Sequence, residues 1–419
     1  MTSILVLSFL ILMAIGIPIA ISLGTASGIV ILLSDNIPML NLVQKVFQSL
    51  DSFPLLAVPM FILAGVLMET SGISKRLINL VSSFVGHIKG GLAIVAVISS
   101  ALFSSISGSG AATAAAIGAI LIPSMIERGY NRNFAAAVPA VSGELGVIIP
   151  PSLTLVVFGA TTNTSIGDLF IAGIIPGILI TLSLIAFVYI VAKIKKYGQE
   201  EYVNWKDRWK AFKESVLALF MPIIIIGGIY GGLFTPTEAA TVAVVYAFLV
   251  GYFIYKEFSI KQVIPMILKS ANSYSIVLIV VATAGLFSWL LARNNVFDGV
   301  SDLFVSITTS PIIFLLLINV LLLIVGMFIE AVGAIVILGP LLLESALTFG
   351  IDPVHFGLIM VVNLAMGMCT PPVGVNLFIS CKIANISIID IAKGVYPLLV
   401  ILWLDLIIIT FIPGISLFL

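Results

Sequence analysis

The chain has 419 residues, of which 61% are hydrophobic and 9% are charged, and its formal net charge is zero. A soluble domain is about one quarter charged, and a nucleic-acid-binding protein carries an excess of positive charge, so this composition excludes both classes. Apolar runs of about twenty residues, the length of a bilayer-spanning helix, recur along the whole chain. We therefore predict an all-α polytopic membrane protein with about a dozen spans or half-spans in the lipid bilayer.

The first half of the chain contains two interruptions of its apolar sequence. It opens on a segment that we interpret as a first span, because it has neither a charged start nor a small-residue cleavage site. The first interruption is a run rich in Gly and Ser, SSISGSGAAT, at residues 104–113, and the second is GVIIPPS at residues 146–152. Proline lacks an N–H and disrupts a helix interior. Because broken backbone at membrane depth is tolerated only where protein or water covers it, these breaks predict a functional site.

The most polar segment, residues 193–214, lies near the middle of the chain and holds seven basic residues against four acidic ones. Loops with an excess of Lys and Arg stay in the cytoplasm. We therefore predict a cytoplasmic linker at residues 193–213. The next basic turn, residues 256–269, should lie on the same side, with the intervening spans 216–233 and 239–255 crossing out and back.

The second half repeats the interruptions of the first, as GMFIEAVGA at residues 326–334 and GMCTPPVGVN at residues 367–376. One offset of 221 residues maps six special backbone residues onto their counterparts: Gly129 to Gly350, Gly146 to Gly367, Pro150 to Pro371, Pro151 to Pro372, Gly173 to Gly394 and Pro176 to Pro397. This pattern predicts an inverted internal repeat, with units 1–192 and 214–419. Paired interrupted spans indicate a transporter's binding site. Because each inverted unit crosses an odd number of times, both termini should lie outside.

The breaks contain the groups that bind ions. A carbonyl freed by a proline is an oxygen ligand for a hard cation, as are Ser and Thr hydroxyls, whereas the N-terminus of a half-helix suits a carboxylate. Two breaks per half therefore predict two similar cation sites beside one anion site. Close helix packing also selects Gly and Ser, and prolines also kink membrane helices. The repetition at one offset favours the functional interpretation.

Acidic residues inside apolar sequence are scarce: Glu69, Glu144, Glu238, Glu330 and Glu344. An ionisable group in a span is a functional candidate. Glu330 is the strongest because it lies in a second-half break, although a carboxylate paired at an interface is the alternative. Glu238 fits a helix start capped by Thr235 or Thr237.

The remaining reactive residue types predict no catalysis. Both cysteines, Cys369 and Cys381, are expected to be small buried side chains, and His87 and His355 to be loop residues at the membrane interface without metal-ligand partners. Paired catalytic acids, H-E-x-x-H and a phosphate-binding loop are all missing from the sequence. This argues against an enzyme and a primary pump. An ion channel, whose filter also uses carbonyl oxygens, stays open as an alternative.

The interrupted segments and their neighbours resemble a known family, the large membrane subunit of tripartite ATP-independent periplasmic (TRAP) transporters of the DctM type. The resemblance covers essentially the whole chain and rests on DSFPLLAVPMFILAG, SGSGAATAAAIGAILIPSM, GVIIPPS, LFIAGIIPG, GGLFTPTEAA, FIEAVGAIVILGP and TPPVGVNLF. One departure is Glu144 in SGELG, where the family is expected to have a small or hydroxyl residue.

The resemblance implies an elevator-type secondary transporter of the bacterial inner membrane, with re-entrant helical hairpins at about residues 92–126 and 312–343. It implies import of a carboxylate-bearing solute, such as a C4-dicarboxylate, sialic acid or another sugar or keto acid, driven by sodium. It also implies two partners: a small four-helix membrane subunit (DctQ type) and a periplasmic substrate-binding protein (DctP type). Sodium is the coupling ion, and no other metal or cofactor is expected.

Combining the breaks with the resemblance assigns site residues. The first sodium site is assigned to Ser104, Ser107, Gly108 or Gly110, with Gly146 and Pro150 opposite. The second is assigned to Gly326 and Gly333, with Gly367, Thr370 and Pro371 opposite. The solute carboxylate is placed near Ser107, Ser152 and Asn376, with Glu330 tuning the site or contacting solute hydroxyls. A proton-coupled transporter of the same fold, using Glu144 or Glu330, is the alternative.

Overall fold

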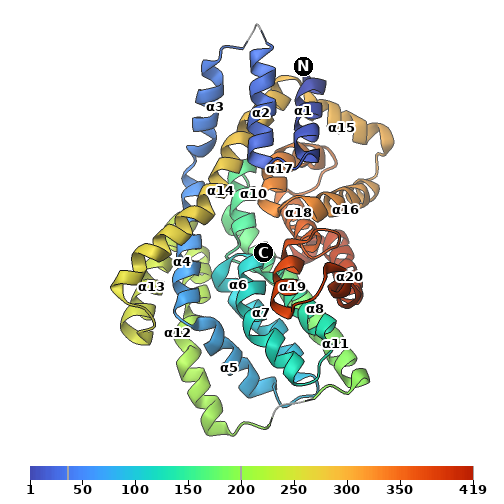
Figure 1. Ribbon diagram of the computed structural model, residues 1–419. Coiled ribbons are helices and arrows are strands. Elements are labelled where there is room, and N and C mark those ends of the chain that lie inside the picture. Colours follow the sequence, from blue (N-terminus) through green and yellow to red (C-terminus); the bar gives the residue numbers. More distant parts are fainter. Residues whose placement is uncertain (35–36, 199–200, 419) are drawn as a thin grey trace.

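The computed structural model describes residues 1–34, 37–198 and 201–418, and all its regular elements are helices (Figure 1). Within these ranges, ten helices are long and apolar enough to cross a membrane by length and composition. The prediction of an all-α polytopic membrane protein is therefore confirmed.

The helices of the first half are α1 (Thr2–Ala14), α2 (Ile19–Leu32), α3 (Leu40–Leu50), η1 (Phe53–Leu56), α4 (Ala57–Thr70), α5 (Ile73–Val85), α6 (Gly91–Ser107), α7 (Gly110–Glu127), α8 (Arg132–Ser142), α9 (Leu145–Ile148), α10 (Leu153–Thr162) and α11 (Ile166–Lys195). Those of the second half are α12 (Trp205–Tyr230), α13 (Pro236–Leu249), the π-helix η2 (Val250–Tyr255), α14 (Ile260–Arg293), α15 (Val296–Ile307), α16 (Pro311–Phe328), α17 (Ala331–Thr348), α18 (Pro353–Gly367), α19 (Val375–Ala384), α20 (Ile388–Phe411) and η3 (Pro413–Ile415).

Helix boundaries in the two halves follow the offset seen in the sequence. Adding 221 to the bounds of α7, 110 and 127, gives the bounds of α17, 331 and 348, and adding it to the start of α8, 132, gives the start of α18, 353. The caps follow the same rule, because the side chain of Asn131 caps α8 and that of Asp352 caps α18. Local sequence signals thus begin equivalent helices at equivalent positions.

Two helical hairpins are the central elements of the two halves. In hairpin 1, α6 and α7 meet at Gly108 and Ser109, and in hairpin 2, α16 and α17 meet at Ile329 and Glu330. The second hairpin extends five residues beyond the expected end at residue 343, because α17 continues through Pro340 to Thr348. Each hairpin is followed by a helix broken at a Pro-Pro pair, α8–α10 in the first half and α18–α19 in the second.

The hairpins and broken helices pack together across the two halves. Helix α7 contacts α8 and α19, α16 contacts α18, and α10 contacts α17. A second group is formed by α4, α13 and α14, with α2 and α3 against α14. The short amphipathic helices α5 and α15 precede the two hairpins and connect this second group to them (Figure 1). Two short helices thus connect the two helical groups, which also pack against each other through α14 with α17 and α4 with α6.

Several local predictions can be compared with the structure. Thr235 and Glu238 form a capping box at the start of α13, as expected for Glu238. Cys369 and Cys381 are both free and buried, which confirms the interpretation as small core side chains. The prediction for His355 is wrong: it lies in the first turn of α18, is 3% exposed, and bonds Ser416 Oγ at 2.6 Å. A polar partner at the end of the chain allows this histidine to be buried.

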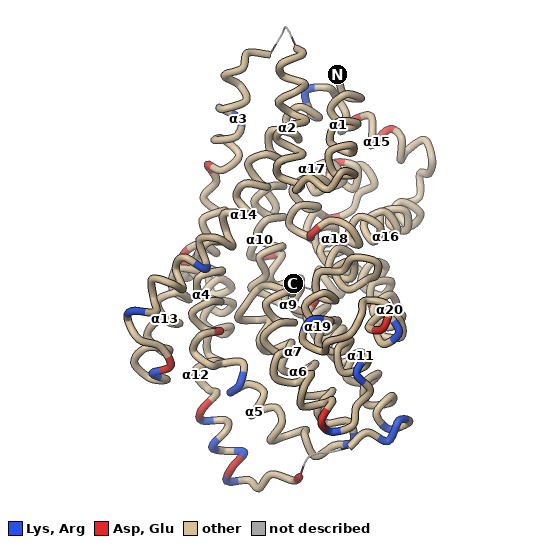
Figure 2. Tube along the Cα trace, viewed as in Figure 1, with Lys and Arg blue, Asp and Glu red and all other residues tan. Residues whose placement is uncertain are grey.

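The linker at residues 193–213 is partly helical, because α11 extends to Lys195 and α12 begins at Trp205; its residues 199 and 200 lie outside the described part of the chain. The link between α11 and α12 lies at the lower end of the molecule, and the N-terminus lies at the upper end (Figure 1). Lys and Arg residues gather along the chain around the link (Figure 2). Basic residues favour a cytoplasmic location for that end.

We expect cysteines introduced at Lys206 and Gly414 to label differently with an impermeant thiol reagent in intact cells. Both positions are exposed, and a side chain added at Gly414 meets no other atom within 4 Å. Basic loops stay inside and an odd number of crossings per half places the C-terminus outside, so only Gly414→Cys should react. Permeabilised cells provide the control, in which both should react. Equal labelling in intact cells would contradict this topology.

Candidate functional site

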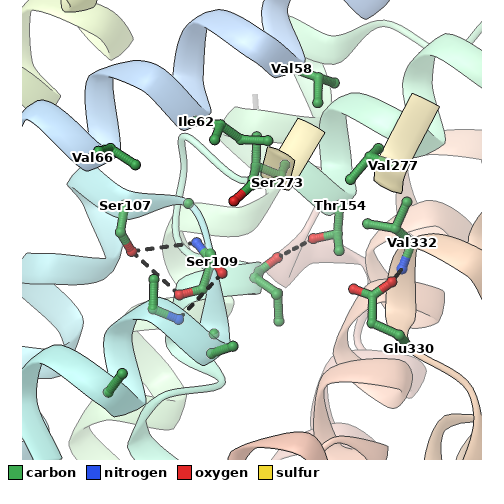
Figure 3. A pocket seen from close by; sticks show the side chains of 18 of the residues that line it. Val58, Ile62, Val66, Ser107, Ser109, Thr154, Ser273, Val277, Glu330 and Val332 are labelled. Atoms are coloured by element: carbon green, nitrogen blue, oxygen red, sulfur yellow. Dashed lines mark hydrogen bonds between the residues drawn. The ribbon is translucent and has the colours of Figure 1, made fainter. Parts of the chain in front are cut away.

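A pocket of about 390 Å³ lies where the tips of both hairpins meet helices α4 and α14 (Figure 3). Hairpin 1 contributes its tip, residues 107–112, and hairpin 2 contributes Glu330 and Val332. Thr154 of α10 lies between them, and Ser273 and Val277 line the pocket from α14. Residues more than 200 positions apart in the sequence therefore share one cavity, large enough for a small organic molecule.

The tip of hairpin 1 is held by the Pro-Pro loop behind it. Gly108 has a positive φ of 62°, which favours glycine, and its carbonyl accepts a hydrogen bond from the Leu153 N–H at 3.2 Å. A Cβ at Gly108 would lie 2.8 Å from the Pro151 carbonyl oxygen, so no side chain fits there. The Ser109 side chain caps α7 by accepting from the Ala112 N–H at 3.4 Å. Residues 110–112, in the first turn of α7, line the pocket, so the positive end of the helix dipole lies at the pocket wall.

The two serines of α6 that were predicted as ligands, Ser104 and Ser107, differ in their surroundings. Ser107 lines the pocket, and its Oγ lies 3.0 Å from Thr113 Oγ1. Ser104 is fully buried, and its Oγ has no hydrogen-bond partner among the described residues. Buried hydroxyls are normally bonded, so Ser104 has a free oxygen that a ligand could use.

Gly146 lies directly against the tip of hairpin 1. A Cβ added there would lie 2.5 Å from the Ser109 carbonyl oxygen and 2.8 Å from the Gly110 nitrogen. The structure therefore brings together Gly146, Gly108 and Gly110 as the sequence predicted. Pro150 lies apart from them, because its ring packs toward Gly173 of α11.

The tip of hairpin 2 ends in a carboxylate. Glu330 caps α17, and its Oε2 accepts from the Val332 N–H at 3.1 Å and the Gly333 N–H at 3.4 Å (Figure 3). Glu330 is the counterpart of Ser109, since 330 − 109 = 221. A carboxylate at this position neutralises the positive end of α17, which leaves the end of α7 as the more electropositive hairpin tip.

The second set of predicted ion ligands is only partly assembled. Gly326 and Gly367 meet backbone to backbone: a Cβ on Gly367 would overlap the Gly326 carbonyl carbon, and one on Gly326 would lie 3.1 Å from the Gly367 Cα. Thr370 is buried and donates its hydroxyl to the Met366 carbonyl at 2.7 Å, which leaves its oxygen lone pairs available. Pro371 is half-buried in the loop that follows. Gly333 faces away from this group, because a Cβ there would contact Ile19 of α2 at 3.3 Å.

Ser152 does not line the pocket. It is fully buried, donates to the Val147 carbonyl at 2.6 Å, lies 2.7 Å from Thr154 Oγ1, and caps α10 through the Leu155 N–H. The expectation of a solute contact here is corrected: Ser152 is a helix cap, and Thr154, two residues later, lines the cavity. An N-cap is the ordinary role of a serine directly before a helix, and that was the signal in the sequence.

Asn376 reaches across to hairpin 1. It is fully buried, and both polar atoms of its amide lack partners among the described residues. A Cβ at Gly110 would lie 3.5 Å from Asn376 Nδ2 and 3.2 Å from the Gly143 carbonyl oxygen. Asn376 therefore lies behind the hairpin tip rather than on the pocket wall. An unpaired buried amide costs about 1–3 kcal/mol, which favours a ligand at this position.

Glu144 lies at the junction of α8 and α9, is 1% exposed, and has no partner for either carboxylate oxygen within the described structure. A buried charge is strongly disfavoured unless it is paired. The side chain therefore either binds a cation or holds a proton. Among the described residues, no group of three or more His, Cys, Asp or Glu side chains is arranged to hold a metal ion.

Comparison with known proteins identifies the family. The family model described as "Tripartite ATP-independent periplasmic transporter, DctM component" matches residues 6–415. The chain belongs to the DctM family of TRAP transporter large permeases. The family is a transporter permease component, so this DctM chain is not an enzyme, and with ten apolar helices it is a multi-pass protein of the inner membrane.

Relatives of this DctM chain carry different solute names. It is 43% identical over 411 residues, 98% of its length, to the isethionate TRAP transporter permease protein DctMQ of Oleidesulfovibrio alaskensis, and it spans 65% of that longer relative. It is 39% identical to the C4-dicarboxylate TRAP transporter large permease protein DctM of Vibrio cholerae, covering 97% of this chain and 94% of the relative. The sialic acid TRAP transporter permease protein SiaT of Haemophilus influenzae is 39% identical over 98% of this chain and 67% of its own length.

A solved structure shares the fold. The crystal structure of the Alcanivorax borkumensis YdaH transporter, described as having an unusual topology, superposes with a TM-score of 0.67 over 90% of this chain and 88% of that one. The two sequences are 14% identical, so the likeness concerns architecture.

Proposed function

We propose that this chain is the large permease of a TRAP system that imports a small organic acid, with the sodium gradient as the energy source. The observation that carries the proposal is the pocket shared by both hairpin tips and by α4 and α14. The names of the relatives extend the solute class from carboxylates to a sulfonate, since isethionate is one of them. The chemistry common to the class is a compact anion with oxygen acceptors.

The anionic group of the solute is assigned to hairpin 1. The first turn of α7 lines the pocket, and Ser107 and Thr154 line it beside that turn. A helix N-terminus favours an anion by charge and by unpaired donors together. Glu330 repels an anion from hairpin 2 and suits the hydroxyl groups of a solute or a bound cation.

One sodium site is assigned behind the tip of hairpin 1, to the amide of Asn376, the carbonyl of Gly143 and the hydroxyl of Ser104. The amide and the carbonyl lie around Gly110, and the amide and Ser104 have unpartnered polar atoms. Asn376, which the sequence analysis assigned to the solute carboxylate, is here assigned to the sodium ion. The second site keeps Thr370 and the carbonyls around Gly326 and Gly367.

An elevator mechanism is proposed from the grouping of the helices. The hairpins and broken helices form one group that carries the predicted ion ligands, and α4, α13 and α14 form another that contacts it through α14 with α17 and α4 with α6. Helices α5 and α15 connect the two groups at short junctions, where Gly72 and Asn295 have positive φ values. Residues at element ends absorb hinge motion, so these junctions suit movement of one group past the other.

Partners follow from the tripartite family name. We propose a small DctQ-type membrane subunit and a periplasmic DctP-type binding protein that delivers the solute. Exposed apolar side chains along α3 and α12, such as Phe47 and Phe220, provide surface for lipid or the small subunit.

Replacing sodium by choline at fixed pH is expected to abolish uptake by the assembled three-component system almost completely, with a sigmoidal dependence on sodium. Two cooperating cation sites are the physical reason. Thr370→Val removes an oxygen ligand and should raise the sodium concentration for half-maximal uptake.

Proteoliposomes containing this chain alone should be inactive. Robust uptake by the single chain, or unchanged uptake in choline, would contradict the proposal.

Proton coupling is the second candidate, and the buried unpaired carboxylate of Glu144 favours it. A carboxylate at that depth gains or loses a proton more readily than it stays charged without a partner. Uptake that persists in choline but is abolished by a protonophore and by Glu144→Gln would select this alternative.

A further inference from the structure

An ion pair between α4 and α14 lies in the wall of the same pocket. Lys269 Nζ lies 3.0 Å from Glu69 Oε2, the two side chains are 58% and 41% exposed, and both line the cavity. Each residue belongs to a helix long and apolar enough to cross the membrane. Charged residues in such helices are rare and costly, and they commonly mark the path of a polar solute.

Stability does not explain the presence of the ion pair between Glu69 and Lys269. An ion pair this exposed contributes little to stability, because water already solvates both charges. Among the described residues the ammonium group of Lys269 bonds Glu69 alone. Arg76, which pairs with Glu257 at 2.8 Å, differs: it also donates to the Ser71 carbonyl and stacks on the Tyr255 ring, 4.0 Å from the centroid. Arg76 is therefore fixed by packing, whereas Lys269 is held by one exchangeable partner.

The residues that line the pocket place Lys269 at the end of one face of α14. Lys269, Ser273 and Val277 are spaced four residues apart and form one face of α14 along the cavity, with Ser273 and Val277 visible in Figure 3. The facing wall from α4, with Val58, Ile62 and Val66, is apolar until it reaches Glu69. The ion pair is thus the polar end of an otherwise apolar wall.

Charge decides what this end of the wall can bind. The charged side chains lining the cavity are Glu69, Glu330 and Lys269, two negative and one positive, so the lining carries a net charge of −1. An anionic solute needs a compensating cation on this wall, and within the described residues Lys269 is the one basic side chain that lines it. Exchange of Glu69 for the solute's carboxylate or sulfonate at Lys269 replaces one charge-assisted hydrogen bond by another.

We propose that Lys269 is a further contact for the solute's anionic group, beside the tip of hairpin 1 that lines the same pocket, and that Glu69 is the partner of Lys269 when the pocket is empty. This rests on the proposed function, since it assumes that the pocket transports an organic acid. Glu69 competes with the solute, so the two residues should have opposite effects on apparent affinity. A merely structural ion pair would give both residues the same effect.

The test is solute uptake by the assembled transporter in sodium, with succinate, N-acetylneuraminate, isethionate and 2,3-diketo-L-gulonate as probes. With whichever probe the unsubstituted system transports, Lys269→Gln should raise the half-maximal solute concentration about tenfold, the value of one charge-assisted hydrogen bond. Glu69→Gln should lower it or leave it unchanged. Lys269→Arg, which keeps the charge, should stay within about twofold, and Glu257→Gln serves as the matched control away from the pocket and should have no effect.

Two results would overturn the inference: an unchanged half-maximal concentration in Lys269→Gln, or equal increases in Lys269→Gln and Glu69→Gln that the double reversal Glu69→Lys/Lys269→Glu restores. Glu69→Gln keeps the inference testable even if Lys269→Gln fails to accumulate in the membrane. Absence of uptake of all four probes by the unsubstituted system would instead count against the proposed function. The two failures are therefore distinguishable.

Discussion

Gly146→Ala is expected to reduce sodium-driven uptake by at least about tenfold, and Gly367→Ala to do the same. The Cβ of an alanine at residue 146 would lie 2.5 Å from the Ser109 carbonyl oxygen, and one at residue 367 would overlap the backbone at Gly326. Backbone cannot rotate away as a side chain does, so each hairpin must separate from its broken helix. Misplacing ligands by about 1 Å costs on the order of 100-fold in a precisely arranged site.

The matched control is Gly227→Ala in α12, because a Cβ there meets no atom within 4 Å and its backbone has an ordinary φ. It should transport normally. Uptake should be measured at equal amounts of permease in the membrane, so that transport is separated from accumulation. Normal uptake by Gly146→Ala at equal abundance would show that the hairpin tip does not depend on this contact.

Asn376→Leu is expected to remove the stabilisation of the purified permease by sodium while leaving it at least as stable without sodium. The amide is fully buried and unpartnered, so an apolar side chain of similar size removes an unsatisfied group of about 1–3 kcal/mol. A bound ion stabilises the native state by RT ln(1 + [ion]/Kd), about 2.7 kcal/mol at 100 times Kd. Thermal unfolding in sodium against choline measures both effects.

Asn319→Leu is the control, because its amide is satisfied at both ends. It donates to Thr410 Oγ1 at 3.0 Å and accepts from Asn363 Nδ2 at 2.7 Å. This variant should be less stable in both salts, with an unchanged sodium increment. If Asn376→Leu retained the full sodium increment, the assignment of Asn376 to the cation would be wrong.

Close contacts between glycines illustrate what a linear pattern can indicate. Gly146 and Gly367 were identified by their shared offset, and the structure places both against hairpin backbone. A repeated glycine indicates either a positive φ, as at Gly129 and Gly350, or the close approach of another backbone, as at Gly146 and Gly367. It does not indicate the partner: Gly146 meets the tip itself, whereas Gly367 meets Gly326, four residues before Glu330.

Side-chain direction accounts for the site residues that were misplaced. Ser152 lies one residue before α10 and uses its side chain as a cap, outside the pocket lining. Gly333 lies two residues into α17 and faces α2. The position of a residue on a helix sets the direction of its side chain around the helix axis. The residues that the side chain meets in that direction come from distant segments of the sequence. Thr154, Lys269 and Ser273 were missed as pocket residues for the same reason.

The sequence by itself determined the membrane class and the positions at which helices begin, break and repeat, because these depend on local hydropathy, proline and glycine chemistry and capping. It also indicated the family, through the resemblance of its motifs. Only the tertiary structure decided which breaks face one another, that Asn376 of the second half reaches hairpin 1, and that Glu69 and Lys269 meet in the pocket wall. Those pairings join residues up to about 270 positions apart. They follow from how helices pack side by side, a property of their shared surfaces that no single segment carries.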